Sequence, residues 1–161
     1  MGVLLTGLAA LAMVACAGMF LRIAWVDFQS LKIRNRDVLY LLGPALILAA
    51  TRDSAGILAD LGAAGLLFAL GLLAWLLRMM GAGDAKLYFP LGLAVGWAGL
   101  GAYALGLILG SVLLLVVTKA GAIFPPGRFR DRLMLFRLRR TYPYGVPMSL
   151  AALVAMVSAG V

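Results

Sequence analysis

Two aspartates lie next to apolar runs that are long enough to cross a membrane. Asp84 ends the segment Gly-Ala-Gly-Asp at 81–84, between two such runs, and Asp27 follows the first run of the chain. An ionisable residue at a membrane segment is costly and predicts a functional site. Two carboxyl groups that share a site titrate as a pair and hold one proton between them. The ionised member takes a proton from water while the protonated member polarises a carbonyl, so the pair predicts the chemistry of an aspartic protease.

The composition excludes most other catalytic sites. The chain has no His and no Glu, and its only acids are Asp27, Asp37, Asp53, Asp60, Asp84 and Asp131. Without imidazole, neither a triad with a His base nor a His-ligated zinc or haem site can form within the chain. The single cysteine, Cys16, lies in an apolar run and is expected to be a small core residue. We therefore expect no metal and no cofactor.

Each acid also has a structural explanation, and the sequence leaves these alternatives open for Asp27 and Asp84. Asp27 lies among bases and is within reach of Arg22 and Lys32 for an ion pair. Asp84 precedes an apolar helix, where Asp is a favoured N-cap. Asp60 lies near the start of a predicted span, where an acid stabilises the first helical turn, so we expect it to act on the helix dipole and not in catalysis.

The elements that must position these residues are membrane helices. The chain is 65% apolar and 12% charged, with a mean hydropathy of +1.08, whereas soluble proteins are about 45–50% apolar and about 25% charged. We predict an all-α integral membrane protein, one membrane-embedded domain over 1–161 with a bundle of about six transmembrane helices. The predicted spans are 3–21, 38–50, 57–77, 87–97, 101–117 and 146–161. The first 21 residues carry no charge, so we expect a retained span and not a signal peptide.

Two further patterns concern the arrangement of these helices. Glycines recur through the fourth and fifth predicted spans, which favours close helix packing, and the break between them at 98–100 predicts a tight hairpin. Arg52 is the only one of the 14 lysines and arginines on the side of the even-numbered connections. The positive-inside rule therefore places both termini outside and both aspartates at the cytoplasmic edge.

The long connection at 119–143 is polar and strongly basic. Its lysines and arginines are Lys119, Arg128, Arg130, Arg132, Arg137, Arg139 and Arg140. Phe129, Leu133 and Phe136 follow a helical spacing, so we expect a short interfacial helix whose arginines reach anionic headgroups of the lipid bilayer. A cytoplasmic loop between two spans explains the charge, and we expect no nucleic acid partner.

Three stretches together resemble the prepilin peptidases, which are membrane aspartyl proteases with a GxGD signature. Residues 81–87, Gly-Ala-Gly-Asp-Ala-Lys-Leu, are similar to the short form associated with tight-adherence (Flp-type) pili. Asp27 is followed by Lys-Ile-Arg-Asn at 32–35, where the family has Lys-Ile-Pro-Asn. Residues 142–147, Tyr-Pro-Tyr-Gly-Val-Pro, are similar to the Pro-Tyr-Gly motif that opens the last helix of the family.

The resemblance implies an aspartic endopeptidase of the bacterial inner membrane that removes the leader peptide of type IV-like, Flp-type prepilins at the cytoplasmic face. Asp27 and Asp84 would be the catalytic pair. Six further positions match the motifs as supporting residues, namely Gly81, Gly83, Lys86, Asn35, Tyr144 and Gly145. Gly81 and Gly83 would shape the backbone around Asp84. The alternative for Lys86 is that its side chain extends to the membrane interface. The alternative for Tyr144 and Gly145 is that they form the turn at the start of a helix.

The sequence departs from the family pattern in two ways. Arg34 stands where the family has proline, which affects the local backbone and not the acid. The larger bifunctional members also carry a cytoplasmic region with paired cysteines that binds zinc, and they methylate the new pilin N-terminus. With Cys16 as the only cysteine, methylation is not supported.

A different class of function remains as the alternative from the sequence. A small transporter or structural membrane subunit would use Asp27 and Asp84 for ion binding or helix pairing. Both acids fall at the edge of the spans and no inverted repeat is visible, which favours the peptidase. A relative that cleaves archaeal preflagellins would share the chemistry and differ in substrate. The sequence does not determine the oligomeric state.

Overall fold

The computed structural model describes residues 2–52, 54–139 and 141–160, and the secondary structure of this part of the chain is entirely helical. Its elements are α1 (Gly2–Ser30), α2 (Asn35–Ala50), α3 (Ser54–Leu76), α4 (Ala82–Lys119), the 3-10 helix η1 (Ala120–Ile123), α5 (Arg128–Arg139) and α6 (Gly145–Ser158). The predicted all-α class is confirmed. Asp53 and Arg140, together with both terminal residues, lie outside the described residues.

Within the described residues, three stretches are long and apolar enough to cross a membrane, namely Gly2–Ser30, Ala55–Leu76 and Ala82–Ile123. The helices α2 and α6 have 16 and 14 residues, fewer than the about 20 of a typical span. The chain is therefore a multi-pass membrane protein, with fewer full-length candidate spans than the six predicted helices.

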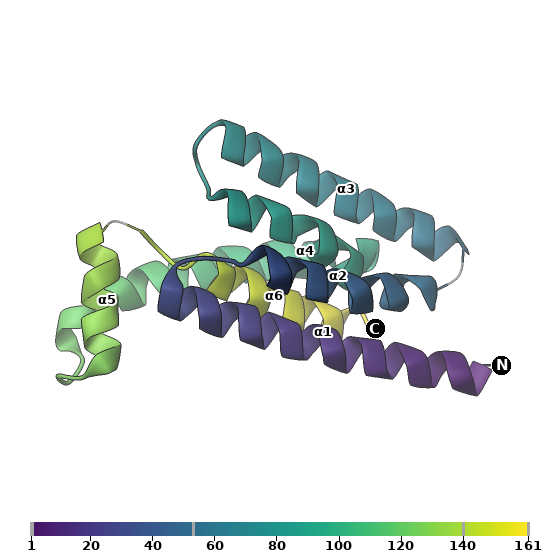
Figure 1. Ribbon diagram of the computed structural model, residues 1–161, viewed down its shortest axis with the longest axis horizontal. Coiled ribbons are helices and arrows are strands. Elements are labelled where there is room, and N and C mark those ends of the chain that lie inside the picture. Colours follow the sequence, from purple (N-terminus) through teal and green to yellow (C-terminus); the bar gives the residue numbers. More distant parts are fainter. Residues whose placement is uncertain (1, 53, 140, 161) are drawn as a thin grey trace.

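The helix α4 consists of two halves that run in opposite directions (Figure 1). Gly96 separates them with φ +69 and ψ 173, a conformation that glycine adopts readily and other residues rarely do. The ring centroids of Tyr88 in the first half and Tyr103 in the second half are 6.5 Å apart. The two halves therefore pack against each other as a helical hairpin. The predicted hairpin is present, but the predicted break at 98–100 is wrong in position, because a single residue makes the turn.

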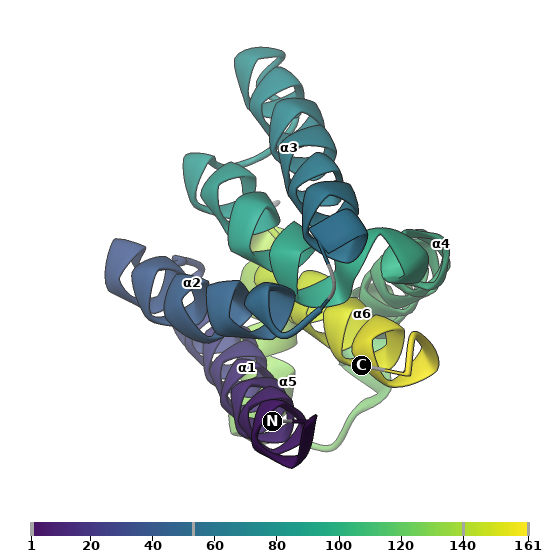
Figure 2. The same ribbon diagram turned by 90° about the vertical axis from the view of Figure 1, so that its right-hand side faces the viewer.

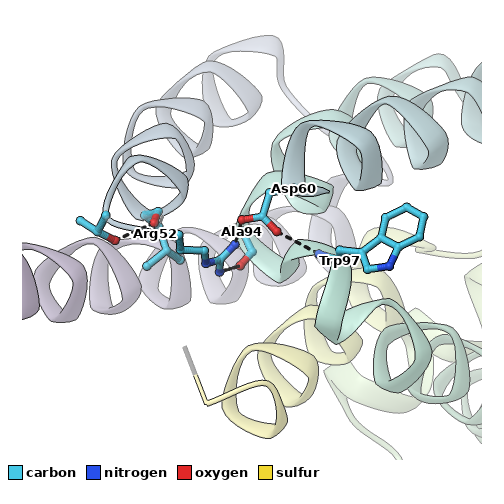
Figure 3. Close-up of polar contacts among 6 residues, drawn as sticks. Arg52, Asp60, Ala94 and Trp97 are labelled. Carbon is cyan, nitrogen blue, oxygen red and sulfur yellow. Dashed lines mark hydrogen bonds and ion pairs between the residues drawn. The ribbon is translucent and has the colours of Figure 1, made fainter. Parts of the chain in front are cut away.

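A buried ion pair stabilises this turn (Figure 3). Arg52 pairs with Asp60, and Asp60 accepts a hydrogen bond of 2.9 Å from the backbone N–H of Trp97. Arg52 Nη2 also donates to the carbonyl of Ala94 at 3.4 Å. The two side chains thus provide hydrogen-bond partners for the carbonyl of Ala94 before Gly96 and for the N–H of Trp97 after it. The prediction for Asp60 is wrong in detail, because it caps the second half of α4 and lies beyond the first turn of α3.

The two halves of α4 pack between α3 and α6 (Figure 2). A Cβ at Gly92 would lie 2.5 Å from the Cα of Ala64 in α3, and one at Gly106 would lie 3.2 Å from the Cβ of Ala151 in α6. Larger side chains at these glycines would push the helices apart. The predicted close packing through small residues is confirmed.

The helix α5 lies across one end of the bundle and not along it (Figure 1). Leu133 and Phe136 are buried, and the ring of Phe136 contacts that of Phe28 in α1 at 5.5 Å. Phe129 is 48% exposed. The predicted short helix is confirmed, and its apolar side packs on the end of α1.

Candidate active site

A cavity of about 510 Å³ brings together three distant parts of the chain. Asp27 from the last turn of α1, Asp84 from the first turn of α4 and Tyr144 before α6 all line it. Asp27 is buried and Asp84 is half-buried, and the two carboxylates are close enough to interact electrostatically. The structure therefore places the two aspartates selected from the sequence in one cavity.

Asp27 is held by the backbone of α6. The helix α1 continues to Ser30, nine residues beyond the uncharged run, so Asp27 is part of the helix. The N–H of Gly145 donates to Asp27 Oδ2 at 2.8 Å. A Cβ at Gly145 would lie 2.9 Å from that oxygen, so only glycine allows this approach. The sequence found Gly145 as a motif position, and the structure shows its contact.

The predicted alternative for Asp27, an ion pair with Arg22, Lys32 or another neighbouring base, is not found among the described residues. Arg22 pairs instead with the buried Asp37, at 3.0 Å between Nε and Oδ1. Within 2–52, 54–139 and 141–160, no base forms a salt bridge with Asp27. A buried carboxylate without a cation is costly unless hydrogen bonds or a second carboxyl that shares a proton offset the burial.

Asp84 is bound by the start of its own helix. Gly81 is the N-cap of α4, and its backbone N–H donates to Asp84 Oδ2 at 3.3 Å. Asp84 is thus the third helical residue, and its carboxylate satisfies the N-cap amide as an acid at that position of a capping box does. Asp84 was predicted as the N-cap of this helix, but the N-cap is Gly81, three residues earlier. In the described part of the chain, no hydrogen bond engages Asp84 Oδ1.

The segment after α1 packs directly on the start of α4. A Cβ at Gly83 would lie 3.2 Å from the Cβ and 3.4 Å from the carbonyl oxygen of Ile33. Nearby, Lys86 Nζ donates to Asn35 Oδ1 at 3.4 Å. The two motif residues whose roles the sequence left open therefore contact each other, and they join the start of α2 to the second turn of α4.

Several other residues that line the cavity were not selected from the sequence. These are Leu31, Lys32, Ile33, Met79, Met80, Thr141 and Tyr142. All lie within a few residues of Asp27, Asp84 or Tyr144. Lys32, Ile33 and Tyr142 also belong to the motif stretches at 32–35 and 142–147, whereas proximity was the only signal for the others. Leu31 has φ 53, an unusual conformation for leucine.

The arrangement suits hydrolysis of a peptide. Each aspartate has one oxygen fixed by a backbone N–H, from Gly145 or from Gly81, and both carboxylates face one cavity. The volume of that cavity lies in the usual range of binding sites, about 300–1,000 Å³. Two fixed carboxylates around a space for substrate and water are the minimum that the two-aspartate mechanism needs.

Comparison with known proteins identifies the family. The family model of the type IV leader peptidases matches residues 13–124, more than half of the chain. The chain belongs to the type IV leader peptidase family. Members are aspartic peptidases that cleave the leader peptides of prepilins, so this protein is an aspartic prepilin peptidase. The match covers Asp27 and Asp84 and ends before α5 and α6. No curated protein and no solved structure matches the chain.

Proposed function

We propose that Asp27 and Asp84 are the catalytic pair of this peptidase and that its substrates are Flp-type prepilins. The observation that carries the proposal is the shared cavity, in which each of two distant aspartates has one oxygen fixed by a backbone N–H. The alternative of a carrier or structural subunit loses support, because the family consists of peptidases.

The proposed reaction needs no group beyond the two carboxyls and water. One carboxylate removes a proton from water, and the hydroxide attacks the scissile carbonyl while the protonated carboxyl donates to the developing oxyanion. The tetrahedral intermediate collapses when the leaving amine takes up a proton from the pair. Gly145 and Gly81 keep the oxygens in place, so little reorganisation accompanies the proton transfers.

The supporting residues act on geometry in this proposal. Lys86 and Asn35 hold the segment around Ile33 against Gly83, and this contact fixes the distance between the end of α1 and the start of α4. Tyr144 is 40% exposed at the cavity and is placed to contact the substrate.

The membrane arrangement follows from charge and hydropathy. We infer one peptidase domain in the bacterial inner membrane, with six crossings if α2, α6 and both halves of α4 each span. The catalytic cavity lies at the same end of the bundle as the basic α5, which the positive-inside rule assigns to the cytoplasm. The substrate would present its leader there, with its apolar helix in the membrane.

Co-expression with an Flp-type prepilin tests the catalytic pair. Asp27→Asn and Asp84→Asn keep the shape of the side chain but cannot share a proton, so both are expected to leave the prepilin at full length on an immunoblot. Asp131→Asn is the matched control, because Asp131 is exposed on α5. Cleavage by either of the first two variants, at normal membrane levels, would show that the pair is wrongly assigned.

A competition between prepilins tests the substrate class. The wild-type peptidase is expected to process an Flp-type prepilin and to leave a prepilin of the larger type IV class mostly uncut. Mass spectrometry of the product is expected to show an unmethylated N-terminus. Preferential processing of the other prepilin, by a peptidase whose Asp27→Asn variant is inactive, would reject the Flp assignment and keep the catalytic pair.

A further inference from the structure

A second crevice lies where the last turns of α1 meet the start of α5. Its volume is about 410 Å³. It is lined by Trp25, Phe28, Gln29, Arg128, Phe129 and Arg132. None of these residues lines the cavity of the two aspartates, so the crevice needs an explanation of its own.

The crevice carries two positive charges without counter-charges. Arg128 and Arg132 lie one helical turn apart on α5 and both face it. In the part of the chain that the structure describes, neither guanidinium has a hydrogen bond or ion pair. Asp131 is the only acid of α5, and it is exposed. The unneutralised guanidinium groups favour an anion, and phosphate oxygens match their geometry.

The other wall of the crevice is aromatic. The ring of Phe28 stacks on that of Phe129 with centroids 6.0 Å apart, and Phe129 also contacts Phe124 at 5.4 Å. Trp25 remains 63% exposed. Tryptophan is enriched where the hydrocarbon of a bilayer meets its headgroups. A free phosphate ion would use the arginines and leave this wall without a partner.

The place of the crevice in the fold gives its depth in the membrane. Trp25 and Phe28 belong to the last turns of Gly2–Ser30, one of the candidate spans. The helix α5 lies across that end of the bundle (Figure 1). If α1 spans the bilayer, this end lies where the hydrocarbon meets the headgroups, so we expect the arginines at the level of the headgroups and the exposed tryptophan toward the hydrocarbon.

We propose that this crevice is a binding site for an anionic phospholipid. Arg128 and Arg132 contact the phosphodiester of the headgroup, and Trp25 and Phe28 contact the first carbons of the acyl chains. The site is distinct from the diffuse attraction of the other arginines of α5, because it combines two guanidinium groups with an aromatic wall in one crevice.

Quenching of Trp25 fluorescence tests the site without any prepilin. The full chain with Trp75→Phe and Trp97→Phe retains Trp25 as its only tryptophan. It is placed in vesicles of phosphatidylglycerol and phosphatidylcholine, with brominated chains on one lipid or on the other. Stronger quenching by the brominated phosphatidylglycerol measures the enrichment of that lipid beside Trp25, and we expect such enrichment.

Two double variants of the single-tryptophan protein, equal in charge to each other, distinguish a specific lipid site from the general electrostatic attraction of α5 for anionic lipids. Arg128→Gln with Arg132→Gln is expected to reduce the enrichment about fivefold or more, since one surface base contributes roughly that factor. Arg137→Gln with Arg139→Gln removes the same charge from exposed positions of α5 and is expected to change it little.

Three results would overturn the proposal. They are the absence of enrichment in the parent protein, an equal loss in both double variants, and displacement of the lipid by millimolar inorganic phosphate. The last result would identify the ligand as free phosphate. Since the readout requires no cleavage, failure of the proposed catalytic pair would leave it unaffected.

Discussion

Gly145 and Asp27 form the closest described contact between α6 and the acid of α1. The N–H of Gly145 fixes one carboxylate oxygen, and the absence of a side chain allows the backbone to approach within hydrogen-bond distance. Such a contact orients the acid for proton transfer, where small displacements of reacting groups lower the rate strongly.

Gly145→Ala is therefore expected to reduce prepilin cleavage by about a hundredfold, the effect of a displacement of roughly 1 Å. The added Cβ would meet Asp27 Oδ2 at 2.9 Å, and Asp27 must move. Gly18→Ala is the control, since a Cβ there meets nothing within 4 Å. Cleavage in membranes at matched protein levels gives the comparison. Wild-type activity of Gly145→Ala would exclude a positioning role for this contact.

At the scale of elements, a residue in a strained conformation follows the end of α3, shortly before the Gly-Ala-Gly-Asp segment at 81–84. Arg78 has φ 59, and its N–H donates to the carbonyl of Trp75 while the N–H of Met79 donates to that of Ala74. This pattern is a Schellman motif, in which glycine usually occupies the left-handed position. The left-handed conformation costs a residue with a side chain about 1–2 kcal/mol.

Arg78→Gly is expected to raise the free energy of unfolding by about 1 kcal/mol. Arg78 is exposed, so loss of its side chain removes few contacts. Arg78→Ala removes the same charge but keeps the Cβ, and it should give no such gain. Unfolding of the purified variants in mixed micelles, followed by circular dichroism, measures the difference. Equal stability of the two variants would show that backbone strain at this position is negligible.

The turn of α4 depends on the ion pair beside Gly96. Asp60→Ala leaves Arg52 partly buried without its partner and Trp97 N–H without its acceptor. Loss of one member of a buried pair costs about 3–5 kcal/mol. We expect that decrease in the same unfolding assay. Arg52→Met with Asp60→Leu removes both charges and should recover most of the stability. A double variant as unstable as Asp60→Ala would show that capping of Trp97, and not the unpaired charge, dominates.

At the scale of the whole molecule, the two ends of the bundle differ in character. The end with α5 contains the cavity of Asp27 and Asp84 and most of the basic residues, and the opposite end contains the turn at Gly96 with its ion pair. This asymmetry is what the positive-inside rule uses to orient a membrane protein.

The orientation is testable with single cysteines. Cys16 is fully buried, so the parent protein is expected to resist a membrane-impermeant maleimide. Ala50→Cys, at the end of α2, should react in intact cells, whereas Arg139→Cys on α5 should react only after the membrane is permeabilised. Both positions are exposed, so each serves as the control for the other. The reverse pattern would invert the proposed topology and place the cavity of Asp27 and Asp84 outside the cytoplasm.

The sequence by itself determined the all-α class of the fold, and it selected the two acids that the structure places in one cavity. Hydropathy marks the apolar runs because the bilayer selects residues locally, and the Gly-Ala-Gly-Asp segment is read from adjacent positions. Local signals also explain the errors. The uncharged run ends at residue 21, yet the hydrogen bonds of α1 continue to Ser30, because polar side chains at an interface do not end a helix.

The tertiary structure alone decided which groups meet. Gly145 lies 118 residues from Asp27, Lys86 lies 51 from Asn35, and Trp97 lies 37 from Asp60. These hydrogen bonds depend on the crossing of packed helices and on the reversal at Gly96. The hydropathy of a local stretch of sequence predicts neither the helix crossings nor the reversal, since both result from the simultaneous fit of side chains from several helices. The acids and the motif glycines were visible in the sequence, and the hydrogen bonds by which the N–H groups of Gly145 and Gly81 hold the acids were not.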